Sequence, residues 1–95
     1  MLKPHQEFIN IYNEIEKFLR IEYGSSNENE RIAHTALIYV SSKKNYTVKQ
    51  HKEDLLSFAK LRNAIVHNAY DSKPIAEPHI EIVKQYKDIR NKILS

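Results

Sequence analysis

Apolar side chains recur at helical spacing along most of this chain. In the first segment an apolar position follows every three or four residues, a period typical of an amphipathic helix with one buried face. The positions on that face are Phe8, Ile11, Tyr12, Ile15, Phe18, Leu19 and Tyr23. Pro4 suits a first helical turn, and Gly24 is typical of a helix stop. The pattern therefore predicts a helix over residues 4–23.

The same period predicts three further helices, over residues 29–43, 47–68 and 78–94. Their apolar faces consist of Ile32, Ala33, Ala36, Leu37, Tyr39 and Val40, then Leu55, Phe58, Ala59, Leu61, Ile65 and Val66, then Ile82, Val83, Tyr86, Ile89, Ile93 and Leu94. Pro78 would open the last of them. We therefore expect an all-α protein, and an up-and-down four-helix bundle is its simplest arrangement.

Length and composition indicate one small domain spanning residues 1–95. The chain has one Gly, three Pro and no Cys, which excludes a disulfide framework, a thiolate metal site and thiol redox chemistry. The first residues do not resemble a signal peptide, and no run is apolar enough for a membrane span. We therefore expect a cytoplasmic protein without a membrane partner. Because so small a domain buries a modest fraction of its surface, we also expect a homodimer.

Positive charge is concentrated in the connection before the third predicted helix. Residues 31–50 carry four basic side chains and no acidic one, within a chain of net charge +3. Lys43, Lys44 and Lys49 are candidates for binding the phosphates of RNA or a nucleotide. A solvated loop after a helix is the simpler explanation for the same lysines. Tyr70, in the connection that follows the third predicted helix, is a candidate for stacking on a base.

Arg62 interrupts the apolar face of the third predicted helix. A guanidinium removed from water is costly unless it is paired, so Arg62 needs a partner, a helix seam or a cleft. Glu22, which falls within the apolar face of the first predicted helix, is one candidate partner. Asn63 and His67 are four residues apart and adjoin the same face. A favourable interaction with the helix dipole is an alternative explanation for His67.

Together these three side chains suit phosphodiester chemistry that uses no metal. Such a reaction needs a proton-transfer group, a polar orienting group and a fixed cation for the anionic transition state. His67, Asn63 and Arg62 provide one of each, although an arginine and a histidine five residues apart also occur by chance. The remaining histidines, His5, His34, His51 and His79, show no i, i+4 pairing and no HExxH motif. We therefore expect neither a metal nor another cofactor.

The segment "LRNAIVHN", residues 61–68, resembles the motif of the HEPN superfamily: an arginine, four to six residues, then a histidine, often with Asn, Asp or His after the arginine. The resemblance implies a dimeric helical bundle in which two motifs meet in one cleft and cleave RNA without metal. His67 would then assist attack by a ribose 2′-hydroxyl, and Arg62 would stabilise the phosphorane. Asn63 would position one of them, and the product would carry a 2′,3′-cyclic phosphate.

A second resemblance supports a different class of function. The stretch from "IVHN" to "IAEPH" is similar to the short helical segment that precedes paired CBS domains in some bacterial proteins. The helical period also still runs at Leu94, as it would in the first module of a longer protein. The alternative hypothesis is therefore a non-catalytic dimerisation or regulatory module, in which Arg62 serves an interface.

Overall fold

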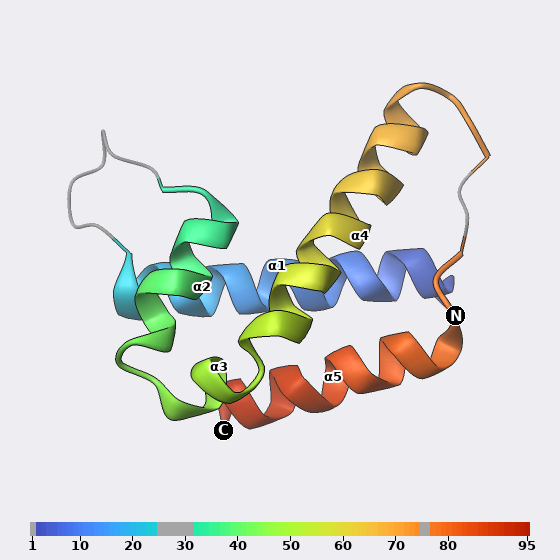
Figure 1. The fold of residues 1–95 in the computed structure, drawn as a ribbon. Coiled ribbons are helices and arrows are strands. Elements are labelled where there is room, and N and C mark those ends of the chain that lie inside the picture. The colour runs from blue at the N-terminus through green and yellow to red at the C-terminus, as the bar shows by residue number, and fades with distance from the viewer. Residues whose placement is uncertain (1, 25–31, 75–76) are drawn as a thin grey trace.

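The computed structural model describes residues 2–24, 32–74 and 77–95, and these residues form helices and connections without a strand. The helices are α1 (Pro4–Tyr23), α2 (His34–Ser42), α3 (Tyr46–Gln50), α4 (Lys52–Tyr70) and α5 (Ile80–Leu94) (Figure 1). The all-α prediction is confirmed. Within the described residues, no helix combines the length and the apolar character needed to cross a bilayer.

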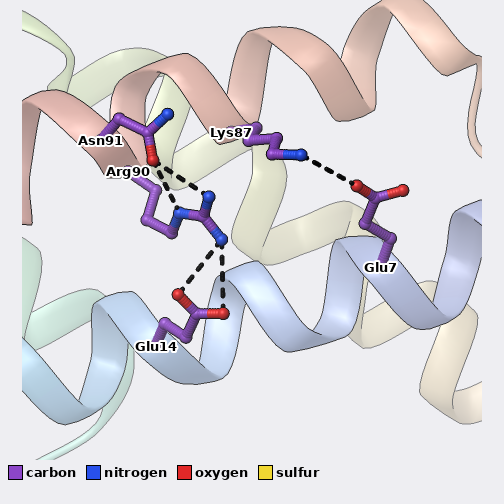
Figure 2. Close-up of polar contacts among 5 residues, drawn as sticks. All are labelled: Glu7, Glu14, Lys87, Arg90 and Asn91. Carbon is purple, nitrogen blue, oxygen red and sulfur yellow. Dashed lines mark hydrogen bonds and ion pairs between the residues drawn. The ribbon is translucent and has the colours of Figure 1, made fainter.

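Helices α1 and α5 pack side by side and run in the same direction, while α4 crosses α1 (Figure 1). Two ion pairs between α1 and α5 show the direction: Lys87 lies 3.6 Å from Glu7, and Arg90 lies 3.1 Å from Glu14 (Figure 2). The later residue of α5 thus pairs with the later residue of α1, so the two helices are parallel. In an up-and-down four-helix bundle the first and last helices are antiparallel. The arrangement therefore differs from the one expected from the sequence.

The connection after α4 returns the chain to the N-terminal end of α1, which makes the parallel pairing possible. Glu77 binds to this end of α1. Its carboxylate accepts a hydrogen bond from the backbone N–H of His5 at 3.1 Å and also contacts the His5 ring. A carboxylate at the first turn of a helix satisfies amides that the helix leaves free and interacts favourably with the helix dipole. From this point α5 runs alongside α1.

The first predicted helix has the expected bounds, whereas the others differ. Helix α2 begins at His34 rather than 29, and residues 29–31 lie outside the described part of the chain. Helix α5 begins at Ile80 rather than 78, because the His79 ring accepts a hydrogen bond from the backbone N–H of Glu81 at 3.1 Å and so caps the helix. Pro78 therefore precedes the helix instead of opening it.

The third predicted helix, 47–68, is divided at His51, whose φ of −107° and ψ of 15° are not helical. Asn45 caps the short first part by accepting a hydrogen bond from the backbone N–H of Val48 at 3.1 Å. The division lets α3 pack on α2 and α5 while α4 packs on α1 and α2. The described residues thus contain five helices, where four were expected.

An aromatic cluster connects α1, α4 and α5 at the centre of the core. The Tyr86 ring lies 4.8 Å from that of Phe8 and 4.6 Å from that of Phe58, measured between centroids. Most predicted core positions are buried. Tyr39 and Val40, which were expected on the inner face of the second helix, are exposed. The buried cluster fixes where α4 crosses α1, and this crossing positions the candidate site.

Candidate functional site

Arg62, Asn63 and His67 lie in the second half of α4, beyond the point where Phe58 packs against Phe8 of α1. Arg62 is half-buried, whereas Asn63 and His67 are exposed. This difference follows from helical geometry, since successive residues turn by about 100° and only Arg62 faces the crossing.

The Arg62 guanidinium packs against an aromatic ring instead of a carboxylate. Its central carbon lies 4.5 Å from the centre of the Tyr12 ring on α1. One terminal nitrogen donates a hydrogen bond to the Asn63 side-chain oxygen at 3.1 Å. The Nε atom is buried and has no hydrogen-bond partner among the described residues. The cation on α4 thus contacts α1 through the Tyr12 ring, and Asn63, its neighbour on α4, accepts one of its hydrogen bonds.

The ion pair of Arg62 with Glu22, the candidate partner named from the sequence, is not formed. Glu22 is exposed near the C-terminal end of α1. It lies ten residues beyond Tyr12, about 15 Å along the helix axis. The angle at which α4 crosses α1 places Arg62 over the middle of α1, out of reach of that carboxylate.

A histidine outside the predicted site, His34, lies beside the Tyr12 ring. The His34 ring on α2 stacks on the Tyr12 ring with 3.9 Å between centroids and an interplanar angle of 21°. Only 6% of His34 is exposed. Its spacing to Leu37, Ile38 and Ser41 is that of one helix face, a signal that could have placed it inward. We call Tyr12, His34 and Arg62 the aromatic–arginine stack.

Two further charged residues on α1 border the stack. A Glu16 carboxylate oxygen lies 3.5 Å from His34 Nδ1 and also 3.5 Å from the Arg20 guanidinium. Arg20 in turn donates a hydrogen bond to the backbone carbonyl of Ile32 at 3.1 Å. The stack is therefore continuous with a short charged row along α1.

Burial and neighbouring charge determine the protonation of the stack. Burial lowers the pKa of His34, Glu16 opposes that shift, and the positive charges of Arg62 and Arg20 lower the pKa further. Burial likewise raises the pKa of Tyr12. His34 and Tyr12 are thus neutral at neutral pH, and Arg62 is the cation of the stack.

His67 points away from the stack and contacts an acid. Its Nε2 lies 3.1 Å from an Asp71 carboxylate oxygen, and 70% of its side chain is exposed. Within the described residues, no hydrogen bond or ion pair joins His67 to Arg62 or Asn63. The structure thus brings Arg62 and Asn63 together and leaves His67 on the surface of α4, one helical turn from Asn63.

The predicted phosphate-binding residues do not gather around the motif. Lys43 and Lys49 line an open hollow of about 600 Å³ that they share with Lys52, Glu53 and Asp54. The two acidic side chains reduce the positive potential of this hollow. Lys44 is exposed outside its lining.

Tyr70 lies at the other end of α4, with 87% of its surface exposed. Eighteen residues separate it from Lys52, a distance of about 27 Å along the helix. The lysines and Tyr70 therefore do not converge on one surface of the protomer. Tyr70 lies on the side of the motif, and the lysines lie at the opposite end of α4.

An apolar groove of about 430 Å³ runs beside the motif, between the start of α1 and the second half of α4. Its apolar lining consists of Leu2, Ile9, Ile65, Val66 and Ala69. Leu2 is 54% exposed and Val66 is 38% exposed. Asn63 and Arg62 lie three and four residues before Val66 and are its neighbours on the α4 surface, so the groove and these two residues form one face, from which His67 turns by about 100°. We call this face the motif face.

The described residues contain no group of three or more histidine, aspartate or glutamate side chains arranged to bind a metal ion. Comparison with protein-family models, with curated proteins and with solved structures found no match to this chain. The function is therefore inferred from the geometry and chemistry of the side chains described above.

Proposed function

We propose that this protein is a HEPN-like RNA-binding domain that acts as a homodimer and cleaves RNA without a metal ion. Arg62, Asn63 and His67 form the half-site that each protomer contributes. The observation that carries the proposal is the Arg62 guanidinium, held at the helix crossing by Tyr12 and Asn63, with the exposed His67 farther along the same helix. A cation fixed in this way stabilises the negative charge that develops on a phosphorane.

The chemistry needs two proton transfers. As the 2′-oxygen attacks phosphorus, a base removes its proton; as the bond from phosphorus to the 5′-oxygen breaks, an acid protonates the leaving oxygen. The products are a 2′,3′-cyclic phosphate and a 5′-hydroxyl. The motif of one protomer contains one histidine, His67, and a second copy of the chain would supply another. The proposed reaction thus favours a site built from two motifs.

The motif face has the properties of a surface for that second copy. Its apolar groove adjoins Arg62 and Asn63, and both Leu2 and Val66 are partly exposed there. Contiguous exposed apolar surface commonly marks an interaction site. We infer that a second copy of the chain joins through this groove.

Cleavage of labelled RNA in excess EDTA tests the proposal. We expect the parent to cleave and both Arg62→Gln and His67→Ala to be inactive while remaining folded. His79→Asn is the matched control, because it replaces an exposed histidine outside the motif with another good capping residue. DNA of the same sequence should stay intact, since it lacks the 2′-hydroxyl. A folded, dimeric parent that neither binds nor cleaves RNA would refute the proposal.

The groove by itself supports a second candidate, a non-catalytic dimerisation or regulatory module. On this hypothesis Val66→Glu converts a dimer to monomer in sedimentation, and His67→Ala has no functional effect. Loss of RNA cleavage in the His67→Ala dimer would exclude this second candidate.

A further inference from the structure

The aromatic–arginine stack uses one residue from each of three helices, and only Arg62 belongs to the motif. An arginine side chain has many rotamers, so a guanidinium that must meet a phosphorane needs neighbours that hold its plane. Tyr12 provides a flat face 4.5 Å from the guanidinium carbon. His34 packs against the same ring at 3.9 Å and so connects α2 to the arrangement.

We propose that Tyr12 and His34 are positioning residues for Arg62: the ring of Tyr12 fixes the guanidinium, and His34 fixes the ring. This inference rests on the proposed function, since it gives Tyr12 and His34 their part in recognising a phosphodiester. Neither residue touches the reacting atoms. Their role is to keep Arg62 in one orientation, in which Asn63 accepts one of its hydrogen bonds.

The burial of His34 supports a role in this arrangement. The residue is only 6% exposed, and its ring Nδ1 lies 3.5 Å from a Glu16 carboxylate oxygen, whereas Nε2 has no hydrogen-bond partner among the described residues. The Glu16 contact and the stacking on Tyr12 are thus the two contacts that hold this buried ring. A leucine would fill similar space at lower cost, whereas a planar ring extends the stack.

The positive charge of Arg62 lowers the pKa of His34, so a titration of His34 tests the stack independently of catalysis. The titratable and charged groups that influence His34 are Glu16 and Arg20 on α1 and Arg62 on α4. Burial is the largest cause of the lowered pKa of His34, Glu16 opposes it, and Arg62 and then Arg20 add to it. Titration of His34 therefore reports whether the Arg62 charge is held nearby.

The first test is an NMR titration of the His34 ring in the parent and in Arg62→Gln. We expect the pKa of His34 to rise in Arg62→Gln, because a nearby positive charge is removed. Arg90→Gln, which removes an equal charge on α5, should leave the titration unchanged. An unchanged titration in Arg62→Gln would overturn the inference, whatever the protein does to RNA.

The second test measures RNA cleavage in Tyr12 and His34 variants. Tyr12→Leu and His34→Ala should lower kcat by about 10- to 100-fold, the usual effect of a misplaced catalytic group. Tyr12→Phe and His34→Phe, which keep a planar ring, should restore most of the rate. Parent-like kcat in folded Tyr12→Leu and His34→Ala would contradict the inference.

The two tests also separate this inference from the proposed function. If the parent does not cleave RNA, the proposed function fails, and the His34 titration still shows whether the stack holds Arg62. If Tyr12→Leu and His34→Ala fail to fold, the titration in Arg62→Gln decides the question, because Arg62 is half-buried and Gln retains most of its stem.

Discussion

The guanidinium of Arg62 lies over the ring of Tyr12, with 4.5 Å from its central carbon to the ring centre, where α4 crosses α1. This contact explains how an arginine occupies a position that the apolar period assigns to the core. A cation–π contact stabilises by about 0.5–2 kcal/mol, depending on how far it is removed from water. It also leaves the guanidinium cationic, available to an anionic ligand at the edge of the helix crossing.

The planar shape of Arg62 should matter as much as its charge. Arg62→Lys keeps a positive charge but loses both the flat stacking surface and the fork of donors. We expect its RNA affinity to fall about tenfold, equivalent to about 1.4 kcal/mol. Fluorescence anisotropy with a labelled oligonucleotide measures this change, and Arg90→Lys is the matched control. Equal affinity of Arg62→Lys and the parent would mean that charge alone suffices.

Stability should fall on acidification because of His34. Its pKa in the folded protein lies below the ordinary value of 6.5, chiefly because of burial. As the pH falls below 6.5, the unfolded chain takes up a proton that the folded chain resists, so the free energy of unfolding decreases, by at most about 1.4 kcal/mol per pH unit. Urea unfolding between pH 7.5 and pH 5 measures the slope.

The His34→Phe variant should lose this contribution, since it keeps a stacked ring that cannot titrate. His67→Gln replaces an exposed histidine and should retain the dependence. An identical pH slope in His34→Phe and the parent would show that another group is responsible.

The pairing of α1 with α5 predicts a measurable difference between two ion pairs (Figure 2). Arg90 contacts both carboxylate oxygens of Glu14, at 3.1 and 3.3 Å, and its side chain is 18% exposed. Lys87 lies 3.6 Å from Glu7 with half of its side chain in solvent. A double-mutant cycle should give about 0.5–1 kcal/mol for Arg90 with Glu14 and less than half of that for Lys87 with Glu7. Equal coupling energies would show that the shorter distances and lower exposure of the Arg90 pair add nothing to its strength.

The Tyr86 hydroxyl should be dispensable. It is buried without a hydrogen-bond partner among the described residues, and burial raises the pKa of Tyr86 far above its ordinary value of 10.0. Tyr86→Phe keeps the ring between Phe8 and Phe58 and should leave the free energy of unfolding unchanged or raise it by about 1 kcal/mol. Tyr86→Leu should lower it by about 1–3 kcal/mol. A clear loss of stability in Tyr86→Phe would reveal a partner for the hydroxyl.

Local signals in the sequence sufficed for the helices whose ends they mark. The limits of α1 follow from its apolar period, Pro4 and Gly24, and all of these act within one turn. The break at His51 lies among six consecutive polar residues, 49–54, where no apolar period sets the course of the helix and no glycine or proline marks an end. The parallel direction of α5 is set by a long-range contact, from Glu77 to His5.

The candidate site was predictable to a similar extent. Arg62 stood out because a charged residue within an apolar face must find a partner. That the partner is Tyr12, and that His34 stacks behind it, depends on the angle at which α4 crosses α1. No short-range sequence pattern predicts that crossing angle. Tyr39 and Val40 show the same limit, since their spacing is that of a core face and yet both are exposed.

The most direct test of the central claim is to identify the ends of the products after RNA is incubated with the protein in excess EDTA. Mass spectrometry should find 2′,3′-cyclic phosphate and 5′-hydroxyl ends with the parent, and intact RNA with His67→Ala. Intact RNA with a folded, dimeric parent, or products that carry 5′-phosphates, would contradict a site in which Arg62 and His67 assist attack by the 2′-hydroxyl.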